Sequence, residues 1–211
     1  MKRIIFIFLL CLFVFISSVK ASLPLQGKLI ILDIGHGSKD MGTSYGDIYE
    51  KDINLAVGKM LEEELSRNGA SVIMTRDDDY DLSIPNANRR KKSDFDNRIK
   101  LINESNGNMY VSIHTNYLSD SKFSGAQVFY YGEDNKNIAE EIQMQLNSIA
   151  YPREVKKMPN VYMYQRLKIP GVLVEVGFLS NSYERNKLVT SEYQKEIANA
   201  ICNGIIKYYN K

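Results

Sequence analysis

The alternation of short apolar runs with amphipathic segments is the feature that most constrains the fold of this chain. Five runs are typical of buried strands, at residues 28–32, 71–75, 109–113, 125–131 and 171–177. Four further segments carry apolar side chains at helical spacing, at residues 53–65, 95–102, 138–149 and 191–209. This repeated β-α-β order predicts an α/β domain with a mostly parallel sheet and helices on both faces.

Two stretches lack a clear period and are predicted to be loops. Residues 76–92 are polar and charged, and residues 151–168 contain prolines and several basic residues. Within the second stretch, the apolar residues at 161–164 favour one short strand. The sequence shows no internal repeat and no low-complexity linker, so a single domain is the simplest organisation.

The first 21 residues have the pattern of a secretory signal peptide. A basic start is followed by an apolar run at 4–16 and then by small residues up to Ala21. The run is shorter than the roughly 20 residues that a spanning helix needs, which favours cleavage over an uncleaved anchor. We therefore expect a signal peptide at 1–21, a short linker at 22–27, and one exported domain at 28–211 with no membrane span.

Removal of the signal peptide changes the charge balance. Residues 1–21 hold three basic residues and no acidic ones, so the formal charge falls from +2 to −1. No clustered basic surface is predicted, which argues against a nucleic acid partner. Cys202 is then the one remaining cysteine, and its apolar neighbours indicate a core residue rather than a nucleophile.

The chain has only two histidines, and each follows a strand-like run. His36 comes shortly after the run at 28–32, and His114 comes directly after the run at 109–113. Groups at the carboxyl ends of parallel strands converge on one crevice, and neutral imidazole is the commonest metal ligand. We therefore expect the two histidines to bind the same metal ion.

Glu175 is the one carboxylate in the otherwise apolar run 171–177. A buried, ionised carboxylate costs several kcal/mol unless it is paired, bound to a metal or placed at the strand's mouth. One interpretation is a salt bridge to an arginine such as Arg98 or Arg166. The interpretation that we favour is a catalytic carboxylate with a tuned pKa.

Glu50 directly precedes a predicted helix and follows a glycine-rich loop. Its position alone is equally typical of a helix-capping or surface charge, because the helix dipole favours a carboxylate there. The preceding loop has four glycines within 12 residues, at positions 35, 37, 42 and 46. Glycines let a chain fold closely around an ion, so we favour Glu50 as a third metal ligand.

Together, His36, Glu50 and His114 form the donor set of a hydrolytic zinc site, which leaves a fourth position for water. In such a site Glu175 would act as general base and then donate its proton to the leaving amine. Two histidines and one carboxylate also form the facial triad of non-haem iron oxygenases. The β-α-β pattern of an exported chain favours a zinc hydrolase with one Zn²⁺ per chain.

Four blocks of this sequence resemble the signature blocks of one enzyme family. They are LDIGHG at 32–37, EK at 50–51, VSIHTN at 111–116 and LVEVGFLSN at 173–181. In this order they are similar to the zinc-dependent N-acetylmuramoyl-L-alanine amidases of the amidase-3 class. The resemblance implies a single α/β domain with a six-stranded sheet, zinc bound by His36, Glu50 and His114, and Glu175 as the catalytic residue.

Other segments resemble the spore-cortex, germination-type members of that family. They are KDINLAV at 51–57, RKKS at 90–93, RIKLINESN at 98–106, GAQVFYY at 125–131 and NVYM at 160–163. This resemblance implies that the enzyme strips stem peptides from cortex peptidoglycan as a step towards muramic-δ-lactam. It places the enzyme outside the cytoplasm, in the spore cortex or the intermembrane space of the forespore. It also implies a lipoprotein as activating partner.

The sequence departs from the family pattern at two positions and leaves two other functions open. Ile34 stands where proline or alanine is usual, and Ser38 stands where a third glycine is common. A zinc carboxypeptidase-like peptidoglycan peptidase would use the same metal chemistry, and only the resemblance ranks it lower. A non-catalytic wall-binding relative is disfavoured because all four chemical positions are filled.

Overall fold

The computed structural model describes residues 22–211, and the predicted signal peptide at 1–21 lies outside the described residues. The strands are β1 (Leu29–Ile34), β2 (Ser44–Tyr45), β3 (Ile48–Tyr49), β4 (Ser71–Met74), β5 (Met109–Asn116), β6 (Gln127–Tyr130), β7 (Lys156–Lys157) and β8 (Gly171–Phe178). The α-helices are α1 (Glu50–Arg67), α2 (Arg90–Glu104), α3 (Lys136–Leu146), α4 (Ser182–Leu188) and α5 (Ser191–Tyr209). Two 3₁₀ turns, η1 (Glu133–Asn135) and η2 (Tyr164–Arg166), complete the chain.

A central sheet of six strands organises the molecule. Its strand order is β4-β1-β5-β8-β6-β7, and the first four strands are parallel to one another. Strand β6 is antiparallel to β8, and β7 is parallel to β6. The predicted single α/β domain with a mostly parallel, six-stranded sheet is thereby confirmed.

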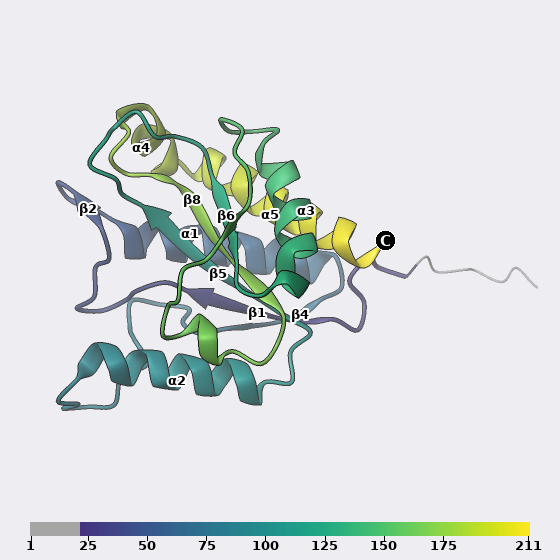
Figure 1. Ribbon diagram of the computed structural model, residues 1–211, viewed down its shortest axis with the longest axis horizontal. Helices are drawn as coiled ribbons and strands as arrows, with labels where there is room; N and C mark the ends of the chain where they lie inside the picture. Colours follow the sequence, from purple (N-terminus) through teal and green to yellow (C-terminus); the bar gives the residue numbers. More distant parts are fainter. Residues whose placement is uncertain (1–21) are drawn as a thin grey trace, which may run out of the picture.

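Helices cover both faces of this sheet, but unequally. Figure 1 shows α1, α3 and α5 together on one face and α2 by itself on the other. Successive side chains of a strand point to opposite faces. Accordingly Ile30, Leu32 and Ile34 of β1 belong to the larger apolar cluster under α1, α3 and α5, whereas Ile31 belongs to the smaller cluster under α2. The sheet is therefore buried on both sides, as parallel sheets usually are.

The segment 151–168 differs from the prediction. Residues 161–164 do not form a strand. The chain turns there and enters η2, while the edge strand β7 lies earlier, at Lys156–Lys157. The reason is packing: Met163 and Tyr164 are both buried in the apolar cluster under α2, which an alternating edge strand could not achieve. Helix α4, for which no period was recognised, also forms.

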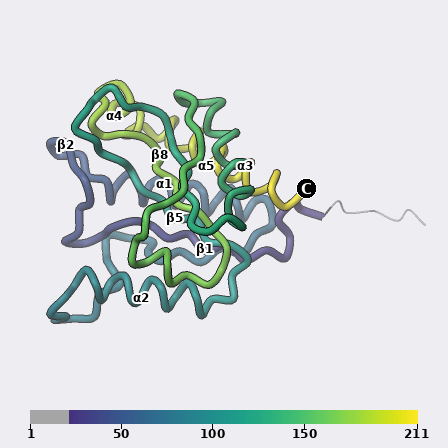
Figure 2. Tube along the Cα trace, in the orientation of Figure 1, coloured from purple at the N-terminus to yellow at the C-terminus, as the bar shows by residue number. Residues whose placement is uncertain are grey.

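The two ends of the described chain lie on the same side of the molecule. Figure 2 shows the C-terminal end of α5 beside the first described residues. Leu25 is fully buried, and the ammonium group of Lys28 lies 4.4 Å from the ring centroid of Tyr209. No helix in residues 22–211 combines the length and the apolar character needed to cross a membrane.

Candidate active site

The candidate site lies at the carboxyl ends of three neighbouring strands. His114 on β5 and Glu175 on β8 are register partners. Tyr110 and Leu173, which have the same parity on these strands, belong to the cluster under α2, so His114 and Glu175 face the α2 side. His36 lies two residues beyond the end of β1, the other neighbour of β5. Both histidines and Glu175 therefore meet at one edge of the sheet, as predicted.

The loop after β1 reaches this edge through two close approaches of glycine. A Cβ atom at Gly35 would lie 2.4 Å from Cε1 of His114. At Gly42, where φ is +68°, it would lie 2.5 Å from Oε2 of Glu50 and 2.7 Å from Cδ2 of His36. Any side chain at these positions would collide with the site. The glycine-rich loop thus closes tightly around the candidate ligands.

Glu50 is the first residue of α1, yet its carboxylate is turned into the site. Its Oε1 accepts a hydrogen bond from the backbone N–H of Thr115 at 3.1 Å, and its Oε2 accepts from the N–H of Thr43 at 2.8 Å. The residue is only 3 % exposed. The alternative of a capping or surface charge is therefore wrong for Glu50, because neither oxygen bonds the free amides of its own helix or points to solvent.

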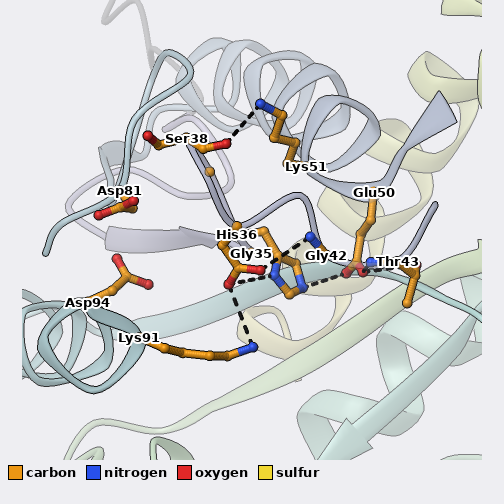
Figure 3. A network of polar contacts seen from close by, with 12 residues as sticks. Gly35, His36, Ser38, Gly42, Thr43, Glu50, Lys51, Asp81, Lys91 and Asp94 are labelled. Carbon is orange, nitrogen blue, oxygen red and sulfur yellow. Dashed lines mark hydrogen bonds and ion pairs between the residues drawn. The ribbon is translucent and has the colours of Figure 1, made fainter. Parts of the chain in front are cut away.

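The three predicted ligands lie within reach of a single ion. Nε2 of His36 is 3.1 Å from Oε1 of Glu50, and Nδ1 of His114 is 2.9 Å from the same oxygen. One donor atom from each residue can be chosen so that all lie within 4.8 Å of one another. Figure 3 shows His36 and Glu50 converging from the loop and from α1, with Gly42 and Thr43 beside them.

The charges of these groups depend on one another. Burial opposes the charged imidazole, but the carboxylates of Asp40 and Glu50 raise the pKa of His36 to about 9. Burial also opposes the charge of Glu50, but hydrogen bonds with the histidines hold the pKa of Glu50 well below its usual range. Oδ2 of Asp40 lies 3.1 Å from Nδ1 of His36. At that distance the negative charge of Asp40 acts directly on the ring of His36.

Glu175 is the candidate acid and base. Its Oε2 is buried and has no hydrogen-bond partner among the described residues. Burial raises the pKa of Glu175 to about 7, and the charge of His114 opposes that rise. The alternative of a salt bridge fails for both arginines: Arg98 pairs with Asp33 and Asp94, and Arg166 donates to the backbone carbonyl of Tyr162. A carboxyl group with such a pKa can both accept and release a proton at neutral pH.

Two pockets flank these groups. One has a volume of about 240 Å³, and its walls include the apolar side chains of Phe95, Val161 and Leu173. The other has a volume of about 340 Å³ and is lined by polar groups that include Lys91 and Asn116. His36, His114 and Glu175 line both pockets. A substrate could therefore extend to either side of the candidate metal site.

A buried polar network around Asp33 lies next to the candidate site, and it was not predicted from the sequence. The hydroxyl of Ser112 donates to Oδ2 of Asp33 at 2.6 Å and lies 3.0 Å from the hydroxyl of Tyr164. Burial opposes the charge of Asp33, but Arg98 and Ser112 lower its pKa. Asp33 and Ser112 are register partners on β1 and β5. Two polar residues at matched positions of apolar strands were the signal that could have revealed this network.

This arrangement defines a class of protein. An α/β sheet that brings two imidazoles, a carboxylate and an unpaired glutamate to the carboxyl ends of its strands is typical of metal-dependent hydrolases. Comparison with known families makes the class specific: the model of a family described as N-acetylmuramoyl-L-alanine amidase matches residues 30–207. The chain belongs to the N-acetylmuramoyl-L-alanine amidase family and is a hydrolase.

Individual relatives agree with this membership. The chain is 43 % identical over 197 residues to the germination-specific N-acetylmuramoyl-L-alanine amidase of Bacillus subtilis, covering 90 % of this chain and 83 % of that protein. Its structure is similar to that of the CwlD amidase from Clostridioides difficile in complex with the GerS lipoprotein, with a TM-score of 0.83, 41 % identity, and coverage of 87 % and 98 %. The amidase AmiC2 of Nostoc punctiforme is similar at a TM-score of 0.76 and 28 % identity, with coverage of 87 % and 98 %.

Proposed function

We propose that the chain is a zinc-dependent amidase that hydrolyses the bond between N-acetylmuramic acid and L-alanine in spore-cortex peptidoglycan. The observation that carries the proposal is the placement of His36, Glu50 and His114 around one point, next to the unpaired buried oxygen of Glu175. Family membership supports the bond that is cut. The likeness to a germination-specific amidase supports the cortex as substrate.

The donor atoms fit zinc. Ligands about 2.0–2.2 Å from a tetrahedral zinc ion lie about 3.3 Å from each other, and the separations of 3.1 Å and 2.9 Å between the imidazole nitrogens and Oε1 of Glu50 are close to that value. Two nitrogens and one oxygen are a common donor set for catalytic zinc. When bound, zinc would supply Lewis-acid activation of the water and of the amide carbonyl.

The side chain of Glu175 would carry the proton between the two halves of the reaction. Its carboxylate accepts one proton from the attacking water. The protonated carboxyl group then donates that proton to the nitrogen of L-alanine as the carbon–nitrogen bond breaks. The products are a lactyl carboxylic acid on the sugar, which loses its remaining proton to solvent, and a stem peptide with a free amino terminus, so Glu175 ends in its starting state.

The biological setting follows from the likeness to germination amidases and from the predicted signal peptide at 1–21. An exported chain would meet cortex peptidoglycan in the intermembrane space of the forespore. There it would remove stem peptides as a step towards muramic-δ-lactam, with a separate deacetylase acting on the stripped sugar. A lipoprotein partner is supported by the similar structure that was determined as a lipoprotein complex.

The decisive experiment measures new N-terminal alanine released from purified cortex peptidoglycan by the chain without its predicted signal peptide, residues 22–211, which keeps the buried Leu25. The reaction is run with added zinc, with zinc removed by a chelator, and with zinc restored. Zinc-dependent release of alanine would support both the bond and the metal. Release of a different amino-terminal residue would contradict the assignment and favour a peptidase. If zinc binds but nothing is released, addition of sporulation extract tests the need for a partner.

A further inference from the structure

Two arginines are buried beside the candidate metal site, where their charges oppose a cation. Arg76 is 0 % exposed and Arg98 is 2 % exposed. A buried guanidinium is costly unless its donors are satisfied. The family blocks and the proposed chemistry assign no role to either residue. Their contacts show what they hold.

Arg98, on α2, donates hydrogen bonds to the end of β1 and to the loop that follows it. Its Nη2 donates to the backbone carbonyl of His36 at 2.8 Å, and its Nη1 donates to the carbonyl of Ile34 at 2.6 Å. The same side chain pairs with Asp33 and Asp94. Two carboxylates therefore balance the charge of Arg98. Its planar guanidinium hydrogen-bonds two backbone carbonyls at once, one at the end of β1 and one in the loop after it.

Arg76, just after β4, connects the same loop to α1. Its Nη2 donates to the carbonyl of Gly35 at 3.0 Å and to the carbonyl of Lys51 at 2.7 Å. Its Nε donates to the carbonyl of Ile34 at 3.2 Å. Lys51 follows Glu50 directly, so one guanidinium links the segment that carries His36 to the segment that carries Glu50. All hydrogen bonds that Arg76 makes within residues 22–211 go to backbone carbonyls.

The backbone at this point needs such support. His36 has φ of +64° and Ser38 has φ of +53°, in the left-handed region that residues with a side chain rarely adopt. A conformation of this kind persists only when surrounding contacts hold it. The carbonyls of three consecutive residues, 34, 35 and 36, each accept a hydrogen bond from a buried guanidinium.

We propose that Arg76 and Arg98 are positioning residues that fix the His36 turn against α1 and thereby set the affinity of the site for its metal. This inference rests on the proposed function, because it takes His36 and Glu50 as ligands. It assigns the arginines no contact with substrate. Arg98 holds the turn from the sheet side, and Arg76 fixes its distance from the first turn of α1.

The test compares Arg98→Lys and Arg76→Lys with a control that is destabilised elsewhere. Lysine keeps the positive charge but cannot fork between two carbonyls. Ile142→Ala serves as the control, since Ile142 is fully buried in α3 and is not among the residues that line the site. Zinc dissociation constants are measured by chelator competition, and the ligand-field spectrum of the cobalt-substituted proteins reports the geometry. Melting temperatures show whether each lysine variant and Ile142→Ala are destabilised to a comparable extent.

We expect each lysine variant to fold and to bind zinc 10- to 100-fold more weakly, as for other residues that orient metal ligands. The cobalt spectrum should change in both variants, and Ile142→Ala should match the wild type in both measurements. Zinc affinity within twofold of the wild type in both lysine variants would overturn the proposal, as would an equal loss in Ile142→Ala. If Arg98→Lys does not fold, the zinc affinity of Arg76→Lys alone tests the proposal. Failure of the wild type itself to bind zinc would refute the proposed function instead.

Discussion

The raised pKa of Glu175 results from its environment rather than from its residue type. It shares the apolar strand β8 with buried valines, and its Oε2 has neither solvent nor a hydrogen-bond donor. Glu50, at the start of α1, accepts several hydrogen bonds. One carboxyl group therefore gains a raised pKa and the other a lowered pKa. Such divergence separates a proton carrier from a metal ligand.

Glu175→Gln is expected to abolish turnover while zinc remains bound. The amide has nearly the same shape but cannot accept the proton of water, so kcat should fall by about 10²- to 10⁴-fold. Zinc content per chain, measured on the purified variant, should stay at one. Glu192→Gln, an exposed change on α5, should behave as the wild type. Loss of zinc from Glu175→Gln would show that Glu175 is a ligand or an anchor instead.

Two glycines of the same loop offer a matched pair for testing how closely the chain approaches the site. Gly42 and Gly46 both have positive φ, at +68° and +57°. A Cβ at Gly42 would collide with Glu50 and His36, whereas one at Gly46 would meet nothing within 4 Å. The cost of the backbone conformation is therefore common to both positions, at about 1–2 kcal/mol for alanine. Only Gly42 adds a steric clash with the ligands.

Gly42→Ala is accordingly expected to lower zinc affinity and amidase activity at least about tenfold, since displaced ligands bind metal poorly. Gly46→Ala should lose a similar amount of conformational stability but keep its activity within about twofold. Chemical denaturation and zinc titration of both variants separate the two effects. Equal activity in the two variants would mean that the loop relaxes away from Glu50.

At the scale of elements, the periodic segments could be predicted from the sequence because their own residues determine them. The helix predicted around 53–65 is α1, and the helix predicted at 191–209 is α5, because each has a continuous apolar stripe. Segment 151–168 could not be predicted in this way. Its structure depends on contacts with residues far along the chain, such as those of Tyr164 with β5. Helix α4 is only seven residues long and has too few turns to show a period.

Tyr164→Phe tests whether segment 151–168 is held by its buried hydroxyl. The hydroxyl of Tyr164 lies 3.0 Å from that of Ser112, which in turn donates to Asp33. Loss of one such hydrogen bond should lower the free energy of unfolding by about 1 kcal/mol. Urea denaturation should show a lower midpoint with an unchanged slope. Tyr151→Phe, at a residue that is 67 % exposed, should leave the midpoint unchanged; equal midpoints in both variants would show that the hydroxyl contributes nothing.

At the scale of the whole molecule, the candidate site exists because the topology gathers segments that are distant in sequence. Strands β1, β5 and β8 are adjacent and parallel, so their carboxyl ends bring positions 36, 114 and 175 to one edge. The convergence of the two histidines could be predicted from the sequence, because each follows a strand-like run and the β-α-β pattern makes those strands parallel. The supporting arginines could not, because Arg76 lies in a loop without a period, and its partners are backbone carbonyls, which carry no sequence signal.

Because the proposed metal site connects the end of β1, the start of α1 and β5, zinc should stabilise the whole domain. A ligand at 100 times its dissociation constant adds about 2.7 kcal/mol to the free energy of unfolding. For a domain of this size each kcal/mol corresponds to about 2–4 °C, so zinc should raise the Tm by roughly 5–10 °C over the chelated protein. Differential scanning calorimetry with and without chelator measures the difference without any substrate.

The same measurement on two variants locates the ion. His114→Ala removes a nitrogen ligand, so its Tm should no longer respond to zinc. Cys202→Ser removes the one thiol of the described residues, which is 2 % exposed and whose pKa burial raises to about 12; it should keep the full response. A response that survives in His114→Ala would place the stabilising ion elsewhere, and a response lost in Cys202→Ser would point to the thiol. Since the readout is stability, the comparison requires no amidase activity.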